Sequence, residues 1–308
     1  MEQLYQRDVY GETLLELGRQ DKDIVVLDAD LSGSTRTNLF AKEFPNRFFN
    51  VGVAEQNLMT VAVGLASCGK KVFVSTFAMF ASGRAWDQVR NSVAYNNFNI
   101  KIVATHAGLT VGPDGASHQA LEDIALMRVI PNMNIVVPCD GPQTADIIKA
   151  VAQAKGVFYV RLGRPKFITI ENKPEFKLGK AQILRDGRDI AIIACGSMVN
   201  EAIIASNNLA KKGVESKVIN VHTIKPLDQE LILEIAQQVR GIVVCEEHSV
   251  IGGLASAVDE IVSENFPVKI SRLGVKNRFG QSGEPRELLK EYNLTSADIE
   301  NAVLSIMP

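Results

Sequence analysis

The sequence lacks several features that mark particular classes of protein. Its 33 Lys and Arg are matched by 35 Asp and Glu, so it has no basic excess of the kind that nucleic-acid-binding or membrane-surface proteins carry. Its longest apolar stretches are the length of a strand, and none approaches the ~20 residues of a membrane-spanning helix. The first dozen residues are polar and acidic, unlike a targeting peptide. We therefore expect a cytoplasmic protein whose partners are neither nucleic acid nor membrane.

Sequence motifs for metals and common cofactors are also missing. The four cysteines form no Cys-x-x-Cys pair, and the four histidines are too dispersed for a local zinc site, so we expect no metal ligand on this chain. Neither Gly-x-Gly-x-x-Gly after a strand nor Gly-x-Ser-x-Gly occurs, which argues against a nicotinamide enzyme and an α/β-hydrolase. Residues 64–70 match Gly-x4-Gly-Lys, but Lys71 follows where a P-loop needs Ser or Thr.

Length and patterning indicate two α/β domains. The chain has 308 residues, of which 46% are hydrophobic and 22% charged, enough for two packed cores. Apolar runs alternate with amphipathic segments, a pattern typical of a parallel sheet covered by helices. In the first half we predict strands at 23–31, 47–52, 71–77, 99–107, 134–138 and 157–162, and helices at 54–68, 84–95, 121–129 and 143–154.

A proline-marked, charged segment interrupts this rhythm. Pro165 and the run Asn172-Lys173-Pro174 lie in it, so we expect a first domain at 1–170, a linker at 171–180 and a second domain at 181–308. In the second domain we predict strands at 189–195, 217–221, 241–245 and 268–274, and helices at 200–212, 228–239, 253–265 and 296–306. Thr295 or Ser296 would cap the last helix.

Polar residues gather where the predicted strands end. In parallel α/β sheets ligands bind beyond the carboxyl ends of the strands, so these residues are the candidates for a site. The segments concerned are 28–34, 52–57, 75–80, 105–118 and 161–164. Two of them are distinctive: Val-Ala-Glu-Gln-Asn at 53–57, and Val-Gly-Pro-Asp-Gly-Ala-Ser-His-Gln at 111–119.

With these two motifs in this order, the chain resembles the C-terminal half of transketolase over essentially its whole length. The resemblance implies a fold in which a parallel-sheet pyrimidine-binding domain for thiamine diphosphate precedes a smaller α/β transketolase C-terminal domain. It also implies a two-carbon ketol transfer from a ketose phosphate to an aldose phosphate, as in the pentose phosphate pathway.

The resemblance assigns a first group of residues to the cofactor. Glu55 would be catalytic, holding a ring nitrogen of the aminopyrimidine and relaying a proton; the alternative is a carboxylate that only stabilises a helix N-terminus. Phe77 and Phe80 would form the aromatic bed for the pyrimidine, or else pack in the core. The family's third aromatic falls on Gly83, which leaves the shape of the pocket open. Asp30 would lie near the thiazolium across a subunit boundary.

A second group is assigned to the sugar. His106 and His118 are expected to be catalytic, with His118 on the donor's hydroxyl or oxyanion and His106 also positioning the sugar phosphate. Asp114 would bind a sugar hydroxyl. A single histidine is usually structural, but two that flank an aspartate on one loop are harder to explain in that way.

A third group would bind the phosphate of the sugar. Arg7, Ser34 and Arg164 match this role, because guanidinium groups bind phosphate with two hydrogen bonds and a serine in a small-residue loop adds a donor. Arg161 is the alternative phosphate ligand to Arg164 if the strand at 157–162 has a different register from the predicted one.

One absence concerns the cofactor's diphosphate. Transketolases hold it through a divalent metal on a Gly-Asp-Gly motif, and this sequence contains no Gly-Asp pair. We therefore expect one subunit of a split transketolase. Its partner, an N-terminal transketolase subunit, would bind Mg²⁺ or Ca²⁺ and the diphosphate. We expect a homodimer core within a heterotetramer, inactive without the partner.

Three alternatives stay open. Two are enzymes of similar architecture: a 1-deoxyxylulose-5-phosphate synthase-like protein, and a 2-oxo acid dehydrogenase beta-type subunit. The third is a non-catalytic assembly or regulatory protein on the same fold, which would have no need of a buried carboxyl at position 55. The second domain shows no comparable cluster of polar residues, and we expect it to support dimerisation.

Overall fold

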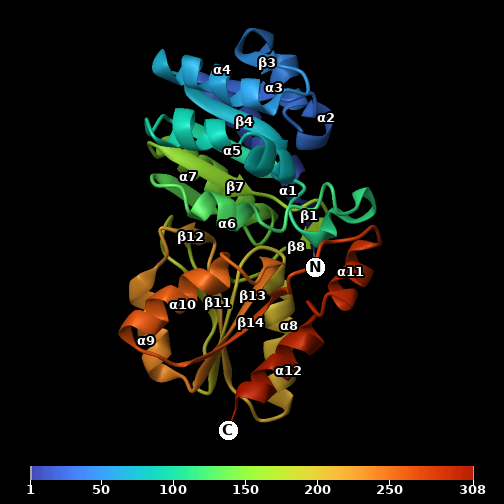
Figure 1. Cartoon of the computed structure of the whole chain (residues 1–308), viewed down its shortest axis with the longest axis vertical. Helices are drawn as coiled ribbons and strands as arrows, with labels where there is room; N and C mark the ends of the chain where they lie inside the picture. Colours follow the sequence, from blue (N-terminus) through green and yellow to red (C-terminus); the bar gives the residue numbers. More distant parts are fainter. Residues whose placement is uncertain (1, 308) are drawn as a thin grey trace.

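A computed structural model describes residues 2–307 of the chain. Its two main sheets follow one another along the longest axis of the molecule (Figure 1). The larger sheet has seven strands in the order β12-β6-β7-β5-β4-β2-β3, parallel throughout except for β12. Its strands are β2 (Ile24–Asp28), β3 (Phe48–Asn50), β4 (Lys71–Phe77), β5 (Ile100–Thr105), β6 (Met133–Val136), β7 (Val157–Arg161) and β12 (Thr223–Lys225). The predicted strands are present, several of them shorter than expected.

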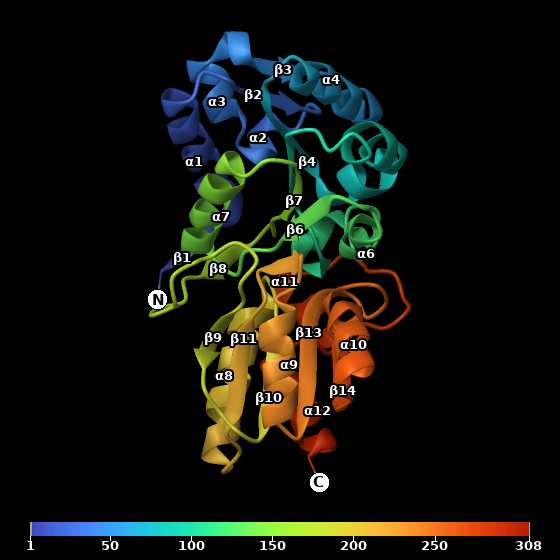
Figure 2. The same ribbon diagram turned by 90° about the vertical axis from the view of Figure 1, so that its left-hand side faces the viewer.

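Helices cover both faces of this sheet (Figure 2). One face carries α1 (Gln6–Gln20), α3 (Asn38–Glu43) and α7 (Gly141–Gln153), and the other α4 (Glu55–Ser67), α5 (Trp86–Gln88) and α6 (Asp123–Arg128). The helix α1 was not predicted from the sequence, although Tyr10, Leu14 and Leu17 are spaced as one helix face and are buried. The helix predicted at 84–95 is instead two π-helical segments, η2 (Phe80–Arg84) and η3 (Val89–Ala94), around α5.

The smaller sheet has the order β14-β13-β10-β11-β9, with only β9 antiparallel. Its strands are β9 (Gln182–Arg185), β10 (Ile190–Ala194), β11 (Ser216–Asn220), β13 (Gly241–Ser249) and β14 (Lys269–Val275). Its helices are α8 (Met198–Lys211) and α12 (Ser296–Ile306) on one face, α9 (Gln229–Gln238) and α10 (Leu254–Asn265) on the other, and α11 (Pro285–Glu291). Thr295 caps α12 through a capping box with Asp298, as one of the two predicted caps. The α/β class, with a larger and a smaller parallel sheet, is confirmed.

The two halves of the chain share structure at their junction. One hydrophobic core continues from α4 and α6 to α9 and α10. The strand β12, from the second half of the sequence, pairs with β6 at the edge of the larger sheet. A two-stranded ladder of β1 (Gln3–Tyr5) and β8 (Lys166–Ile168) also lies there. The short elements α2 (Ser32–Thr35), η1 (Pro45–Arg47) and η4 (Leu109–Asp114) complete the fold. Residues of the smaller domain can therefore contact the loops of the larger sheet.

Candidate functional site

Glu55 is the first residue of α4 and is almost completely buried, with its side chain 1% exposed. Its Oε2 accepts a hydrogen bond from Arg84 Nη1 at 2.9 Å. No residue from 2 to 307 hydrogen-bonds to its Oε1. A buried carboxylate oxygen that has no partner loses its hydration without compensation, so this oxygen is suited to a ligand that supplies a donor.

Four aromatic rings gather at the ends of β4 and β5. The rings of Phe77 and Phe80 are stacked, with centroids 6.2 Å apart and planes 16° apart. The imidazole of His106 lies nearly parallel to Phe77 at 3.9 Å. His118 stands edge-on to both phenylalanines, with centroid distances of 6.4 and 5.3 Å. Residues from two predicted segments thus form one aromatic surface.

One side chain of this site was missed from the sequence. The guanidinium of Arg84 lies 4.6 Å from the centroid of Phe80 and also bonds to Glu55, so it bridges the carboxylate and the aromatic surface. Next to Phe77 in sequence, Thr76 is buried, and its hydroxyl has no partner within residues 2–307. A signal existed for Arg84, because it follows Phe80 by four residues, a spacing that places side chains on one helical face.

His106 is buried and has a left-handed backbone, with φ of 59°. Its Nδ1 lies 2.9 Å from the hydroxyl of Thr105. Burial, followed by the positive charges of Arg7 and Arg164, lowers the pKa of His106 to about 3. The imidazole is therefore neutral at neutral pH, with one ring nitrogen as donor and the other as acceptor.

Arg7 and Arg164, two predicted phosphate ligands, carry positive charges that help to lower the pKa of His106. Arg164 Nη1 donates to the carbonyl of Val111 at 2.5 Å, and its Nη2 lies 4.0 Å from Asp114 Oδ1. Arg7 lies over the Tyr5 ring at 4.9 Å, and its Nε has no partner within the described chain. The structure thus groups the predicted sugar and phosphate residues Arg7, His106, Asp114 and Arg164.

Other predicted residues are not brought into this group. Asp30 is exposed and exchanges two hydrogen bonds with Asn50, at 2.8 and 3.1 Å. Ser34 lies in α2, and no hydrogen bond within residues 2–307 joins it to Arg7 or Arg164.

The structure contradicts the alternative assignment of Arg161 as a phosphate ligand. It is buried, and its Nε donates to Asp123 Oδ2 at 2.8 Å. Its Nη2 donates to the carbonyls of Ala120 and Glu247 at 3.1 and 3.0 Å. These contacts use Nε and Nη2 of the buried guanidinium inside the protein, so Arg161 is not available to hold a phosphate.

Residues 2–307 contain neither a metal-binding cluster nor a membrane-spanning helix. No group of three His, Cys, Asp or Glu side chains there could hold a metal ion. No helix in that range combines the length and the apolar character required to cross a membrane.

Two protein-family models match the chain. Residues 2–168 match the transketolase pyrimidine binding domain, and residues 179–299 match the transketolase C-terminal domain.

Several curated relatives match along nearly their whole length. A putative transketolase C-terminal section from Methanocaldococcus jannaschii is 51% identical, covering 98% of this chain and 96% of that protein. A 6-deoxy-6-sulfo-D-fructose transketolase subunit from Clostridium sp. (strain MSTE9) is 41% identical over 98% and 94%. An apulose-4-phosphate transketolase subunit from Phocaeicola vulgatus is 41% identical over 98% and 97%. Against transketolase from Homo sapiens, at 36% identity, the chain spans only 49% of the length.

A solved structure is similar over the whole chain. It is a split-gene transketolase described as an inactive beta4 tetramer, 48% identical with a TM-score of 0.91, and the match covers 98% of both chains. A transketolase from Campylobacter jejuni, at 22% identity, has the same fold with a TM-score of 0.84 over 99% of this chain and 47% of its own.

Proposed function

Because this chain belongs to the transketolase family, as a split subunit with the pyrimidine-binding and C-terminal domains, we propose that it forms half of a two-chain transketolase. The complex would transfer a two-carbon ketol unit from a ketose phosphate to an aldose phosphate with thiamine diphosphate, the cofactor of this family. The observation that carries the proposal is the unpartnered Oε1 of Glu55, buried beside the stacked Phe77 and Phe80.

The site fits the aminopyrimidine end of the cofactor. Glu55 Oε1 would hydrogen-bond a pyrimidine ring nitrogen and exchange a proton with it, while the two phenylalanine rings offer a flat apolar surface for stacking. The hydroxyl of Thr76 is a second buried group that needs a partner. When bound, the cofactor would supply the carbanion chemistry that cleaves and forms carbon–carbon bonds next to a carbonyl. Asp30 is proposed to approach it from a neighbouring subunit.

The remaining residues would bind the sugar. His118 would donate a hydrogen bond to a hydroxyl of the ketose substrate or to the oxyanion that develops on it. The neutral His106 would orient the sugar chain. Asp114 would accept a hydrogen bond from a sugar hydroxyl. Its neighbour Arg164 would bind the terminal phosphate by charge and geometry.

Arg7 and Ser34 are proposed to complete the phosphate site. Support for Arg7 comes from its unpartnered Nε and from the effect of its charge on the pKa of His106. Ser34 rests on the sequence pattern alone.

A partner chain is part of the proposal. The sequence has no Gly-Asp pair to bind the metal ion that would hold the cofactor's diphosphate. It also spans only about half of the length of the human transketolase. The partner, an N-terminal transketolase subunit, would bind Mg²⁺ or Ca²⁺ and the diphosphate. The similar beta4 tetramer is described as inactive, which supports the expectation that this chain needs its partner. A homodimer core within a heterotetramer would place Asp30 of one copy near the site of another.

The preferred sugar is a separate question. Two relatives are named for 6-deoxy-6-sulfo-D-fructose and for apulose 4-phosphate, so the transferred unit would be the common feature and the rest of the sugar the variable one. The alternatives of a 1-deoxyxylulose-5-phosphate synthase-like or 2-oxo acid dehydrogenase beta-type subunit require a 2-oxo acid donor. A non-catalytic protein on this fold would bind no cofactor.

The test uses the chain copurified with its partner. Xylulose 5-phosphate with ribose 5-phosphate is compared with pyruvate as donor, and thiamine diphosphate binding is followed by calorimetry. We expect ketol transfer from the sugar, and Glu55→Gln should abolish turnover while leaving the complex assembled. Turnover of Glu55→Gln at the wild-type rate would contradict the proposal. So would turnover with pyruvate as donor and none with xylulose 5-phosphate.

A further inference from the structure

A carboxylate of the smaller domain reaches the loop that carries Asp114 and His118. Glu247, on β13, is buried. Its Oε1 accepts a hydrogen bond from the backbone N–H of Thr110 at 2.7 Å, in η4. Its Oε2 accepts from the hydroxyl of Ser197, at the start of α8, at 2.5 Å. Both oxygens therefore have partners, one in each domain.

The approach is close, because residue 108 has no side chain. Gly108 has φ of 84°, and a Cβ there would meet the carboxylate of Glu247. Only glycine adopts this conformation freely while leaving space for the carboxylate. The backbone at 108–110 is thus shaped around Glu247.

The smaller domain also holds the other end of the loop. Gln119 Nε2 donates to the carbonyls of Leu109 and Gln281, at 3.0 and 2.9 Å. The start of α11 packs on η4, with Pro285 against Gly112, and Figure 1 shows α11 beside this loop at the junction. Residues 108–119 are therefore fixed at both ends by groups of the smaller domain.

We propose that Glu247 is a positioning residue: through Thr110 it fixes the loop that presents Asp114 and His118 to the sugar. The inference rests on the proposed function for its link to activity, and it gives the smaller domain a role beyond the dimer support expected from the sequence. Hydrogen bonds to a carboxylate are short, and a functional group must be held within about 0.5 Å of its productive position. Misplacing a substrate-binding group by about 1 Å lowers the rate about 100-fold.

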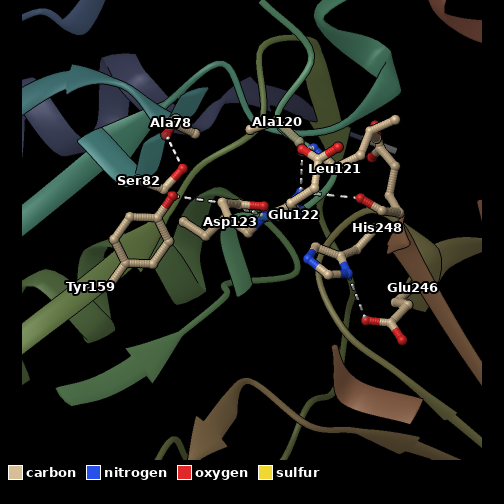
Figure 3. Close-up of polar contacts among 12 residues, drawn as sticks. Ala78, Ser82, Ala120, Leu121, Glu122, Asp123, Tyr159, Glu246 and His248 are labelled. Atoms are coloured by element: carbon tan, nitrogen blue, oxygen red, sulfur yellow. Dashed lines mark hydrogen bonds and ion pairs between the residues drawn. The ribbon is translucent and has the colours of Figure 1, made fainter. Parts of the chain in front are cut away.

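The chain offers a matched control in the neighbouring residue. Glu246 is also buried on β13, but its carboxylate accepts from the backbone N–H groups of Leu254 and Ala255 at the start of α10, at 2.7 and 2.9 Å. Its Oε2 lies 3.7 Å from Nδ1 of His248 on the same strand. Figure 3 marks this contact with a dashed line. Glu246→Gln therefore perturbs a buried carboxylate of the same domain without touching residues 108–119.

The first arm of the test is hydrogen exchange, measured by mass spectrometry on the full chain. Glu247→Ala should speed exchange in a peptide covering residues 108–119 at least about tenfold, because the N–H of Thr110 loses its acceptor. Glu247→Gln keeps an oxygen for Thr110 and an amide that can donate to Ser197, so it should stay within about threefold of wild type. Glu246→Gln should leave that peptide unchanged. Unchanged exchange in Glu247→Ala, or a uniform rise over the smaller domain, would overturn the proposal.

The second arm is kinetic and uses the complex with the partner subunit. Glu247→Ala should raise KM for xylulose 5-phosphate and lower kcat/KM about 100-fold, with thiamine diphosphate binding within about twofold of wild type. Glu247→Gln should recover most of the loss. Equal weakening of cofactor and sugar binding would indicate a merely structural role. If the wild-type complex shows no ketol transfer, the proposed function fails, whereas the exchange measurement still decides whether Glu247 holds the loop.

Discussion

Replacing Asp123 by Asn removes the charge that neutralises a buried arginine. Asp123 Oδ2 accepts from the Tyr159 hydroxyl and from Arg161 Nε, each at 2.8 Å. The side chains of Arg161 and Asp123 are 7% and 0% exposed. Figure 3 shows the Tyr159 ring directed at Asp123. Burial acts to lower the pKa of Arg161, but the charge and hydrogen bond of Asp123, together with the charges of Glu247 and Tyr159, outweigh burial and keep the pKa raised, so the guanidinium stays charged.

The expected loss of stability follows from that burial. Removing one partner of a buried ion pair destabilises a fold by about 3–5 kcal/mol, because the other charge remains without compensation. At about 2.1 cal/mol/K per residue, 308 residues have an unfolding entropy of about 0.65 kcal/mol/K. The loss therefore corresponds to a fall in Tm of about 5–8 °C.

Thermal unfolding followed by circular dichroism measures this effect. The control is Glu43→Gln, since Glu43 pairs with Arg19 at 2.7 Å on the exposed surface, where a lost ion pair should leave Tm almost unchanged. The double variant Asp123→Asn/Arg161→Met should recover part of the loss by removing the stranded charge. A fall in Tm no larger than that of Glu43→Gln, or a double variant less stable than the single one, would refute the reasoning.

Two further predictions concern residues of the same region. His106 has a pKa of about 3 in the folded protein and about 6.5 in the unfolded chain. Its neutral form therefore contributes fully to the stability of the fold above pH 6.5, and this contribution is lost as the pH falls towards 3. At pH 5 protonation of His106 in the unfolded chain lowers the free energy of unfolding by about 2 kcal/mol. Urea unfolding at pH 7.5 and 5 should therefore show a smaller loss of stability in His106→Asn, because asparagine tolerates the left-handed backbone but does not titrate. Equal acid sensitivity of the variant and the wild type would contradict this. Gly108→Ala should lower stability by at least about 1–2 kcal/mol because its φ is 84° and Glu247 occupies the space, measured by urea unfolding. Gly64→Ala, in open space on α4, should instead gain about 0.5–1 kcal/mol, and a similar gain for Gly108→Ala would rule out the close approach.

Most of the larger sheet could be predicted because its strands are short apolar runs separated by polar turns, and each central run is buried on both faces. The errors occur where local pattern and tertiary packing differ. The strand expected at 23–31 ends at Asp28, because that carboxylate turns back to accept hydrogen bonds from Leu31, Thr35 and Thr37. The helix α1 was missed because its exposed polar residues hide a narrow apolar face.

The candidate site shows the same division. Glu55, Phe77, Phe80 and the loop histidines could be named as candidates because they belong to motifs at strand ends, and the fold brings strand ends together. Arg84 was missed, because its importance depends on a contact with a residue 29 positions earlier.

The amino-acid order by itself determined the two-domain α/β class, the family motifs and the residue types available for cofactor and sugar, because each is a local pattern. The tertiary structure alone decided which charges are consumed and which stay available: Arg161 is paired with Asp123, whereas Glu55 keeps one oxygen without a partner among residues 2–307. It also decided that Glu247, 137 residues away along the chain, contacts Thr110. Such contacts depend on how two domains pack, and no local pattern encodes the distance between side chains so far apart in sequence.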